Sequence, residues 1–85
     1  MPAKTLFVHP SVKKNLKKFP MHIHKKVIAS LDKIQENPLI GAKLSGELTS
    51  YFKYRIGDYR IVYRLDSKNN VIEVAKIEHR QGVYK

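Results

Sequence analysis

Two runs of alternating residues, joined by a single Gly-Asp pair, constrain the fold of this chain more than any other feature. The runs are residues 51–56 (YFKYRI) and 59–65 (YRIVYRL), with Gly57 and Asp58 between them. Alternation with a period of two is typical of β-strands, and a two-residue Gly-X connection is typical of a tight hairpin. The sequence therefore predicts one antiparallel β-hairpin in this part of the chain.

The two faces of this hairpin differ in chemistry. One face is expected to cover a core, because all its side chains are apolar or aromatic: Phe52, Tyr54, Ile56, Tyr59, Ile61, Tyr63 and Leu65. The other face is mostly cationic and holds Tyr51, Lys53, Arg55, Arg60, Val62 and Arg64. In this register Arg55 lies directly opposite Arg60, and like charges across a strand pair repel each other. The basic face is therefore expected to be open to a ligand.

An anion between Arg55 and Arg60 would reverse this repulsion, because guanidinium groups match phosphate oxygens in a forked geometry. The alternative is a solvated face whose side chains splay into water, as many surface charges do. The whole chain favours a polyanionic partner, because 17 Lys and Arg residues against 7 Asp and Glu give a formal net charge of +10. Nucleic acid is the more common partner of this kind, and an anionic membrane is the less common one.

Two helices are predicted before the hairpin. Pro10 suits the first turn of a helix, and the apolar stripe that follows consists of Val12, Leu16 and Phe19. A second helix is predicted after Pro20, with one apolar face made of Ile23, Val27, Leu31 and Ile34. It ends at Asn37, because a residue that precedes a proline avoids helical geometry. The two helices are expected to form an antiparallel hairpin that covers the apolar face of the strands.

The remaining segments complete one small domain. Residues 3–8 are predicted as a first strand and residues 71–77 as a last strand, while residues 38–47 form a loop and residues 78–85 a tail. A chain of 85 residues is long enough for one such domain, which we expect to span residues 1–85.

The residue types exclude several kinds of site. The chain has no cysteine, so it offers neither a disulfide nor a thiolate metal site, and its acidic residues are scattered singly. We therefore expect no metal and no cofactor, which excludes a two-metal nuclease. No apolar run approaches the roughly 20 residues that span a bilayer, so a cytoplasmic protein without a membrane partner is expected. Metal-free cleavage of RNA, in which the 2′-OH attacks the adjacent phosphate, remains open to a basic site.

Three segments resemble the RelE/ParE superfamily of bacterial and archaeal type II toxins: VHPSVKKNLKKFP, YRIGDYRIVYRLD and IEVAKIEHRQGVYK. The resemblance covers almost the whole chain. It implies an α+β fold of the order β-α-α-β-β-β, with an N-terminal helical hairpin packed on a small, mostly antiparallel sheet, which agrees with the elements predicted above. It also implies a cognate antitoxin as partner, bound in a toxin–antitoxin hetero-oligomer.

Two branches of this superfamily differ in activity. RelE-like toxins are endoribonucleases that cut mRNA on the ribosome and inhibit translation, whereas ParE-like toxins poison DNA gyrase and lack the nuclease site. The RelE-like site has basic residues on the strands of the hairpin, an arginine near the end of the chain and a tyrosine close to the C-terminus. The matching residues here are Lys53, Arg55, Arg60, Arg80 and Tyr84. The resemblance therefore favours the RelE-like branch, and gyrase poisoning is the alternative.

Each matching residue has an expected role in RNA cleavage. Lys53 is expected to accept the proton of the 2′-OH, because neighbouring cations disfavour its charged form. Arg60 would hold the scissile phosphate with help from Arg55, and Arg80 would stabilise the phosphorane or help to protonate the leaving oxygen. Tyr84 would stack on a base or orient the nucleophile, unless its ring closes the edge of the core.

A second group of cations is expected to bind the RNA backbone without sequence preference. These candidate RNA-binding residues are Lys13, Lys14, Lys17, Lys18 and Arg64. For the four lysines the alternative is a solvated helix face.

Overall fold

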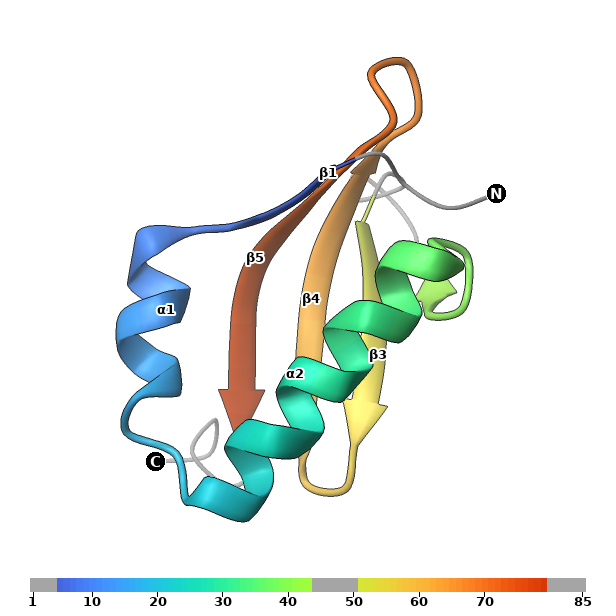
Figure 1. Ribbon diagram of the computed structural model, residues 1–85. Coiled ribbons are helices and arrows are strands. Elements are labelled where there is room, and N and C mark those ends of the chain that lie inside the picture. The colour runs from blue at the N-terminus through green and yellow to red at the C-terminus, as the bar shows by residue number, and fades with distance from the viewer. Residues whose placement is uncertain (1–4, 44–50, 80–85) are drawn as a thin grey trace.

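The computed structural model describes residues 5–43 and 51–79 of the chain (Figure 1). In chain order the elements are β1 (Thr5–Val8), α1 (Pro10–Leu16), α2 (Met21–Glu36), β2 (Ala42–Lys43), β3 (Tyr51–Ile56), β4 (Tyr59–Asp66) and β5 (Val71–His79). Both helices lie on the same face of a five-stranded sheet. This arrangement confirms the predicted α+β fold.

The strand order places β4 at the centre of the sheet. The order is β1-β5-β4-β3-β2, so the first strand of the chain lies beside the last one (Figure 1). β1 runs parallel to β5, with Thr5 opposite Val71, and the other neighbouring strands are antiparallel. Side chains of β4 therefore have neighbours on both sides, from β3 and from β5.

The register of the β3–β4 hairpin is as predicted. Arg55 lies opposite Arg60 and Lys53 lies opposite Val62. Gly57 has a φ of +57°, the left-handed value that the first central residue of a type II′ turn requires. The tight Gly-X turn thus fixes which side chains share each face of the hairpin.

Two parts of the sheet differ from the prediction. Residues 42–43 were expected in a loop, but they form β2 and pair with β3, because a strand of two residues carries no alternation that sequence could reveal. The last strand continues beyond residue 77, so Glu78 and His79 belong to β5 and not to a tail. Glu78 consequently lies opposite Arg60. The rest of the predicted tail, residues 80–85, lies outside the described ranges, as do residues 3–4 of the predicted first strand and residues 44–47 of the predicted loop.

The core lies between the helices and the apolar face of the sheet. α1 packs against β5, and α2 returns across the sheet to β3 (Figure 1). Phe19 follows the end of α1 but is half-buried against the core, as its place in the apolar stripe predicts. The buried core residues are Val12, Leu16, Val27, Leu31, Ile34, Phe52, Ile61, Tyr63, Ile72, Val74 and Ile77. No helix in the described ranges is long and apolar enough to cross a membrane.

A buried tyrosine attaches the segment after α2 to the sheet. The hydroxyl of Tyr63 donates to the carbonyl oxygen of Pro38 at 2.8 Å and accepts from the amide of Gly41 at 3.1 Å. A Cβ at Gly41 would come within 2.7 Å of both this hydroxyl and the carbonyl oxygen of Lys53, so only glycine fits here. Burial raises the pKa of the Tyr63 hydroxyl, which remains a neutral donor.

Tyr63→Phe is expected to lower the free energy of unfolding by about 1–3 kcal/mol, because it leaves the Pro38 carbonyl and the Gly41 amide without their shared partner. Urea denaturation followed by circular dichroism measures this loss. Tyr54→Phe is the matched control, since that ring is only half-buried, and it should change stability by less than about 0.5 kcal/mol. Equal losses in the two variants would contradict the assigned role of the buried hydroxyl.

Candidate functional site

Among residues 5–43 and 51–79, five cations lie on the face of the sheet that is opposite the helices, and we call this surface the basic face. Its cations are Lys53, Arg55, Arg60, Arg64 and Lys76. Lys53 and Arg55 are exposed on β3, while Arg60 and Arg64 are partly covered on the central strand β4. The prediction that one face of the hairpin is basic and open is therefore confirmed.

Two shallow hollows meet on the basic face. One has a volume of about 350 Å³ and is lined by Ile40, Gly41, Ala42, Lys53, Tyr54, Arg55 and Arg60. The other has a volume of about 430 Å³ and is lined by Tyr51, Lys53, Arg60, Val62, Ala75, Lys76 and Glu78. Lys53 and Arg60 line both hollows, so an anion bound by these two cations would be accessible from both hollows.

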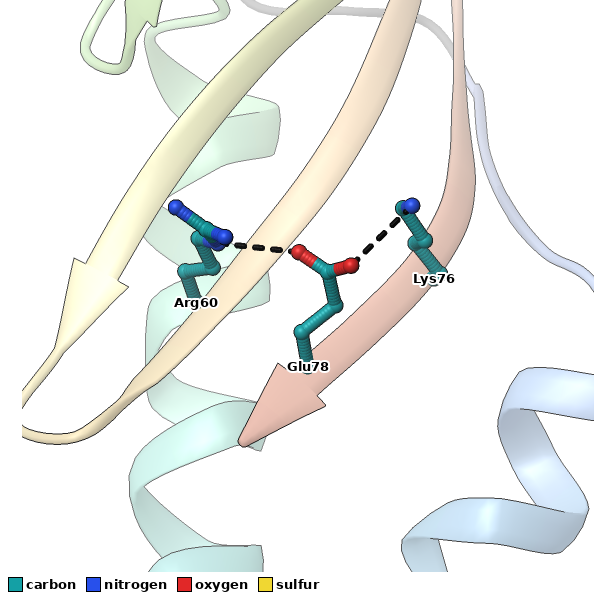
Figure 2. A network of polar contacts seen from close by, with 3 residues as sticks. All are labelled: Arg60, Lys76 and Glu78. Carbon is teal, nitrogen blue, oxygen red and sulfur yellow. Dashed lines mark hydrogen bonds and ion pairs between the residues drawn. The ribbon is translucent and has the colours of Figure 1, made fainter. Parts of the chain in front are cut away.

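Glu78 joins two of the cations on this face (Figure 2). Arg60 Nε donates to Glu78 Oε1 at 2.9 Å, and Lys76 Nζ lies 3.0 Å from Glu78 Oε2. The hydrogen bond from Lys76 is the main reason that the pKa of the Glu78 carboxyl lies below its usual value; burial opposes it, and the hydrogen bond from Arg60 acts in the same direction as the one from Lys76. The carboxylate therefore offsets the expected repulsion between Arg55 and Arg60, and this repulsion by itself no longer requires a bound anion.

The lowered pKa of Glu78 predicts how this network responds to acid. The Glu78 carboxyl has a lower pKa in the folded protein than in the unfolded chain. The network therefore contributes stability above the unfolded pKa and loses it as the pH falls through the lower folded pKa. We expect the Glu78 carboxyl carbon to titrate in an NMR experiment with a midpoint below the value of a glutamate in an unfolded peptide. Lys76→Ala should raise that midpoint, and a wild-type midpoint at or above this value would contradict the network.

A β-bulge explains why sequence reasoning missed Lys76 and Glu78. Val62 pairs with Lys76 but Tyr63 pairs with Val74, so β5 contains one extra residue, Ala75. The extra residue reverses the alternation of β5 and turns the following side chains to the other face. The signal in the sequence is the spacing of the buried residues Ile72, Val74 and Ile77, which changes from two to three.

The other predicted site residues do not all share this surface. Lys13 and Lys14 on α1, and Lys17 and Lys18 directly after it, are exposed in the helical layer, away from the basic face. Arg64 does lie on the basic face, where its Nε donates to Glu73 Oε1 at 3.2 Å. Arg80 and Tyr84 lie outside the described residues.

His79 points to the helical side of the sheet. Its ring centroid is 4.5 Å from that of Tyr59, which in turn lies 5.0 Å from that of Phe19. These aromatic contacts attach the turn end of the hairpin to the connection between the helices. Within residues 5–43 and 51–79, no three side chains of His, Asp or Glu are placed to hold a metal ion.

The family model described as "ParE toxin of type II toxin-antitoxin system, parDE" matches residues 6–84. The chain belongs to this family of type II toxins. The resemblance to the RelE/ParE superfamily that the sequence motifs indicate is thereby confirmed.

Several relatives of this ParE-family toxin carry RelE names. Toxin RelG of Mycobacterium tuberculosis is 29% identical over 77 residues, which cover 88% of each chain. The toxin–antitoxin complex RelBE2 of the same organism contains a chain with a TM-score of 0.81 and 27% identity, covering 94% of this chain and 93% of that one. The isolated RelE toxin of E. coli has a TM-score of 0.79 and 25% identity, with 94% and 89% covered.

Proposed function

We propose that this toxin is a ribosome-dependent endoribonuclease that cleaves mRNA without a metal ion. The observation that carries the proposal is the position of Lys53 and Arg60 at the junction of two hollows on an open, cationic surface. A single-stranded RNA places one nucleotide on each side of its scissile phosphate, and a phosphate at this junction would leave one hollow for each neighbour. The similarity to toxin RelG and to RelE structures supports the same activity.

The proposed reaction is an internal transfer of the phosphate. The 2′-oxygen forms a bond to phosphorus while the bond to the 5′-oxygen breaks, which gives a 2′,3′-cyclic phosphate and a 5′-OH end. Lys53 is the proposed acceptor of the 2′-OH proton, and Arg60 and Arg55 would stabilise the phosphorane as its negative charge develops. Arg80 is the proposed partner of the leaving 5′-oxygen, and Tyr84 is the proposed partner of a nucleobase. Both roles rest on the match of these residues to the family motif.

Binding to the ribosome would use the wider positive field of the molecule. Arg64 extends the basic face, and the exposed lysines on and after α1 add a second cationic surface: Lys13, Lys14, Lys17 and Lys18. Such contacts bind phosphates without sequence preference and weaken as salt increases. The proposed site of action is the cytoplasm. There a cognate antitoxin, like those in the RelE–RelB complexes of relatives, would form a hetero-oligomer and cover the basic face.

Gyrase poisoning is the second candidate function, and the match to the ParE family model favours it. One experiment separates the two functions. Purified toxin is added to ribosomes programmed with a defined mRNA, and the ends of the products are mapped. Cleaved mRNA with 5′-OH ends is the expected result. Intact mRNA, together with trapped gyrase–DNA complexes in a parallel assay, would overturn the nuclease proposal.

A further inference from the structure

The Glu78 carboxylate is less exposed than the two cations that it binds. The exposed fraction of its side chain is 24%, against 40% for Arg60 and 59% for Lys76. Each carboxylate oxygen contacts a different cation, Oε1 the guanidinium and Oε2 the ammonium (Figure 2). The acid therefore lies between the two cations and contacts both of them.

The contact to Arg60 leaves its terminal nitrogens available to a ligand. The bond to Glu78 uses Nε, at the base of the guanidinium group. In Figure 2 a terminal nitrogen of Arg60 points away from Glu78 and over β3. A guanidinium held in this way presents donors in a fixed fork, the geometry that matches two oxygens of a phosphate.

We propose that Glu78 is a positioning residue that holds Arg60 and Lys76 together as a binding site for one RNA phosphate. Lys76 thereby becomes a further phosphate-binding residue. This inference rests on the proposed function for the identity of its ligand. Two cations and one carboxylate leave one net positive charge, which matches the single negative charge of a phosphodiester. Ordering two long side chains before the ligand arrives also removes an entropic cost from binding.

The same contacts argue against Glu78 as the base that accepts the 2′-OH proton. Both carboxylate oxygens already bind cations, and the resulting low pKa makes the group a weak proton acceptor. Glu78 therefore acts through Arg60 and Lys76.

The first test is a double-mutant cycle on the rate of cleavage at saturating ribosomes. Glu78→Ala should slow cleavage about 10–100-fold, because a misplaced phosphate contact has effects of this size. Glu78→Gln should slow cleavage less than Glu78→Ala does, since its amide oxygen still accepts from Arg60 Nε while its amide nitrogen cannot accept from Lys76. In an Arg60→Ala background, Glu78→Ala should have a clearly smaller effect than in the wild type, because only the contact to Lys76 is then left to lose. Independent, multiplying effects would overturn the positioning role. If Glu78→Ala does not fold, Glu78→Gln takes its place in the same cycle with Arg60→Ala, and multiplying effects there would overturn the role equally.

The second test does not depend on cleavage. The probe is a 2′-O-methyl RNA trinucleotide, which lacks the attacking hydroxyl, and the readout is the NMR signals of the Arg60 Nε–H and the Lys76 side chain. Both signals should shift when the probe binds to the wild-type protein. Glu78→Ala should broaden the Arg60 signal and weaken binding. If the trinucleotide shifts neither signal in the wild-type protein, the phosphate site is refuted, even when mRNA cleavage is observed.

Glu73 provides the matched control, because it accepts from Arg64 Nε across the same pair of strands. Glu73→Ala should leave the Arg60 signal in place and change the cleavage rate by less than about threefold. If the wild-type protein cleaves no mRNA, the proposed function fails, and the NMR titration still decides the positioning role. Equal losses of cleavage rate in Glu73→Ala and Glu78→Ala would mean that both acids only balance the positive charge of the basic face. That result would overturn the proposal.

Discussion

Arg60→Ala is expected to reduce the rate of mRNA cleavage about 10²–10³-fold while the domain remains folded. Arg60 lines both hollows of the basic face, and in the proposed mechanism its terminal nitrogens stabilise the charge that develops on the phosphorane. A contact that strengthens in the transition state lowers the rate constant of the chemical step when it is removed. The loss should therefore persist at saturating ribosomes.

The stability of the Arg60→Ala variant is expected to stay within about 1 kcal/mol of the wild type. The variant loses the half-exposed contact to Glu78, but Glu78 keeps its contact to Lys76. The substitution also removes the like charge opposite Arg55. Arg60→Lys should restore little activity, because an ammonium group has no planar fork. Lys25→Ala removes the same charge from the exposed surface of α2 and should leave the rate unchanged.

The measurement is single-turnover cleavage of ribosome-bound mRNA, with circular dichroism to determine the folded fraction. A variant that unfolds, and whose remaining activity is proportional to the folded protein, would make Arg60 a structural residue. The nuclease proposal would then lose its central side chain.

The register of the hairpin could be predicted to the residue because three local constraints agree there. The alternation of residues 51–56 and 59–65 fixes two faces, and Gly57 supplies the left-handed φ that a two-residue turn needs. A shift of one residue would bury Lys53 and expose Phe52, so the alternative registers are energetically unfavourable. Arg60 and its neighbours on the basic face follow directly from this register.

The acidic part of the site could not be predicted because it depends on a contact between strands that are distant in the sequence. Strict alternation from Ile72 and Val74 would place Lys76 in the core and Glu78 with it, and the bulge at Ala75 reverses that order. The position of a bulge depends on how β5 pairs with β4. Within the sequence of β5 itself, the position of Ile77 is the one indication of the bulge. The alternation of β3 and β4 therefore predicts four cations of the basic face, whereas the places of Lys76 and Glu78 depend on the bulge.

Side chains on the face of β4 that packs against the helices are expected to contribute to stability and not to cleavage. Ile61 directly follows Arg60, but its side chain is fully buried between the sheet and the helices. Ile61→Ala removes buried methyl groups and leaves a cavity, which lowers the free energy of unfolding by about 2–5 kcal/mol. Domains of this size have a total stability of roughly 4–13 kcal/mol, so the loss is a large fraction of the whole.

Ile61→Ala and Arg60→Ala should therefore give opposite phenotypes, although the two residues are neighbours in the chain. Urea denaturation should show the large loss for Ile61→Ala and a smaller one, about 0.5–1.5 kcal/mol, for Ile61→Val. Cleavage per folded molecule should stay within about threefold of the wild type, because the side chain of Ile61 does not line either hollow. A variant that keeps its full stability, or that stays folded but loses cleavage as Arg60→Ala does, would show that the two faces of β4 are not separated in function as the structure indicates.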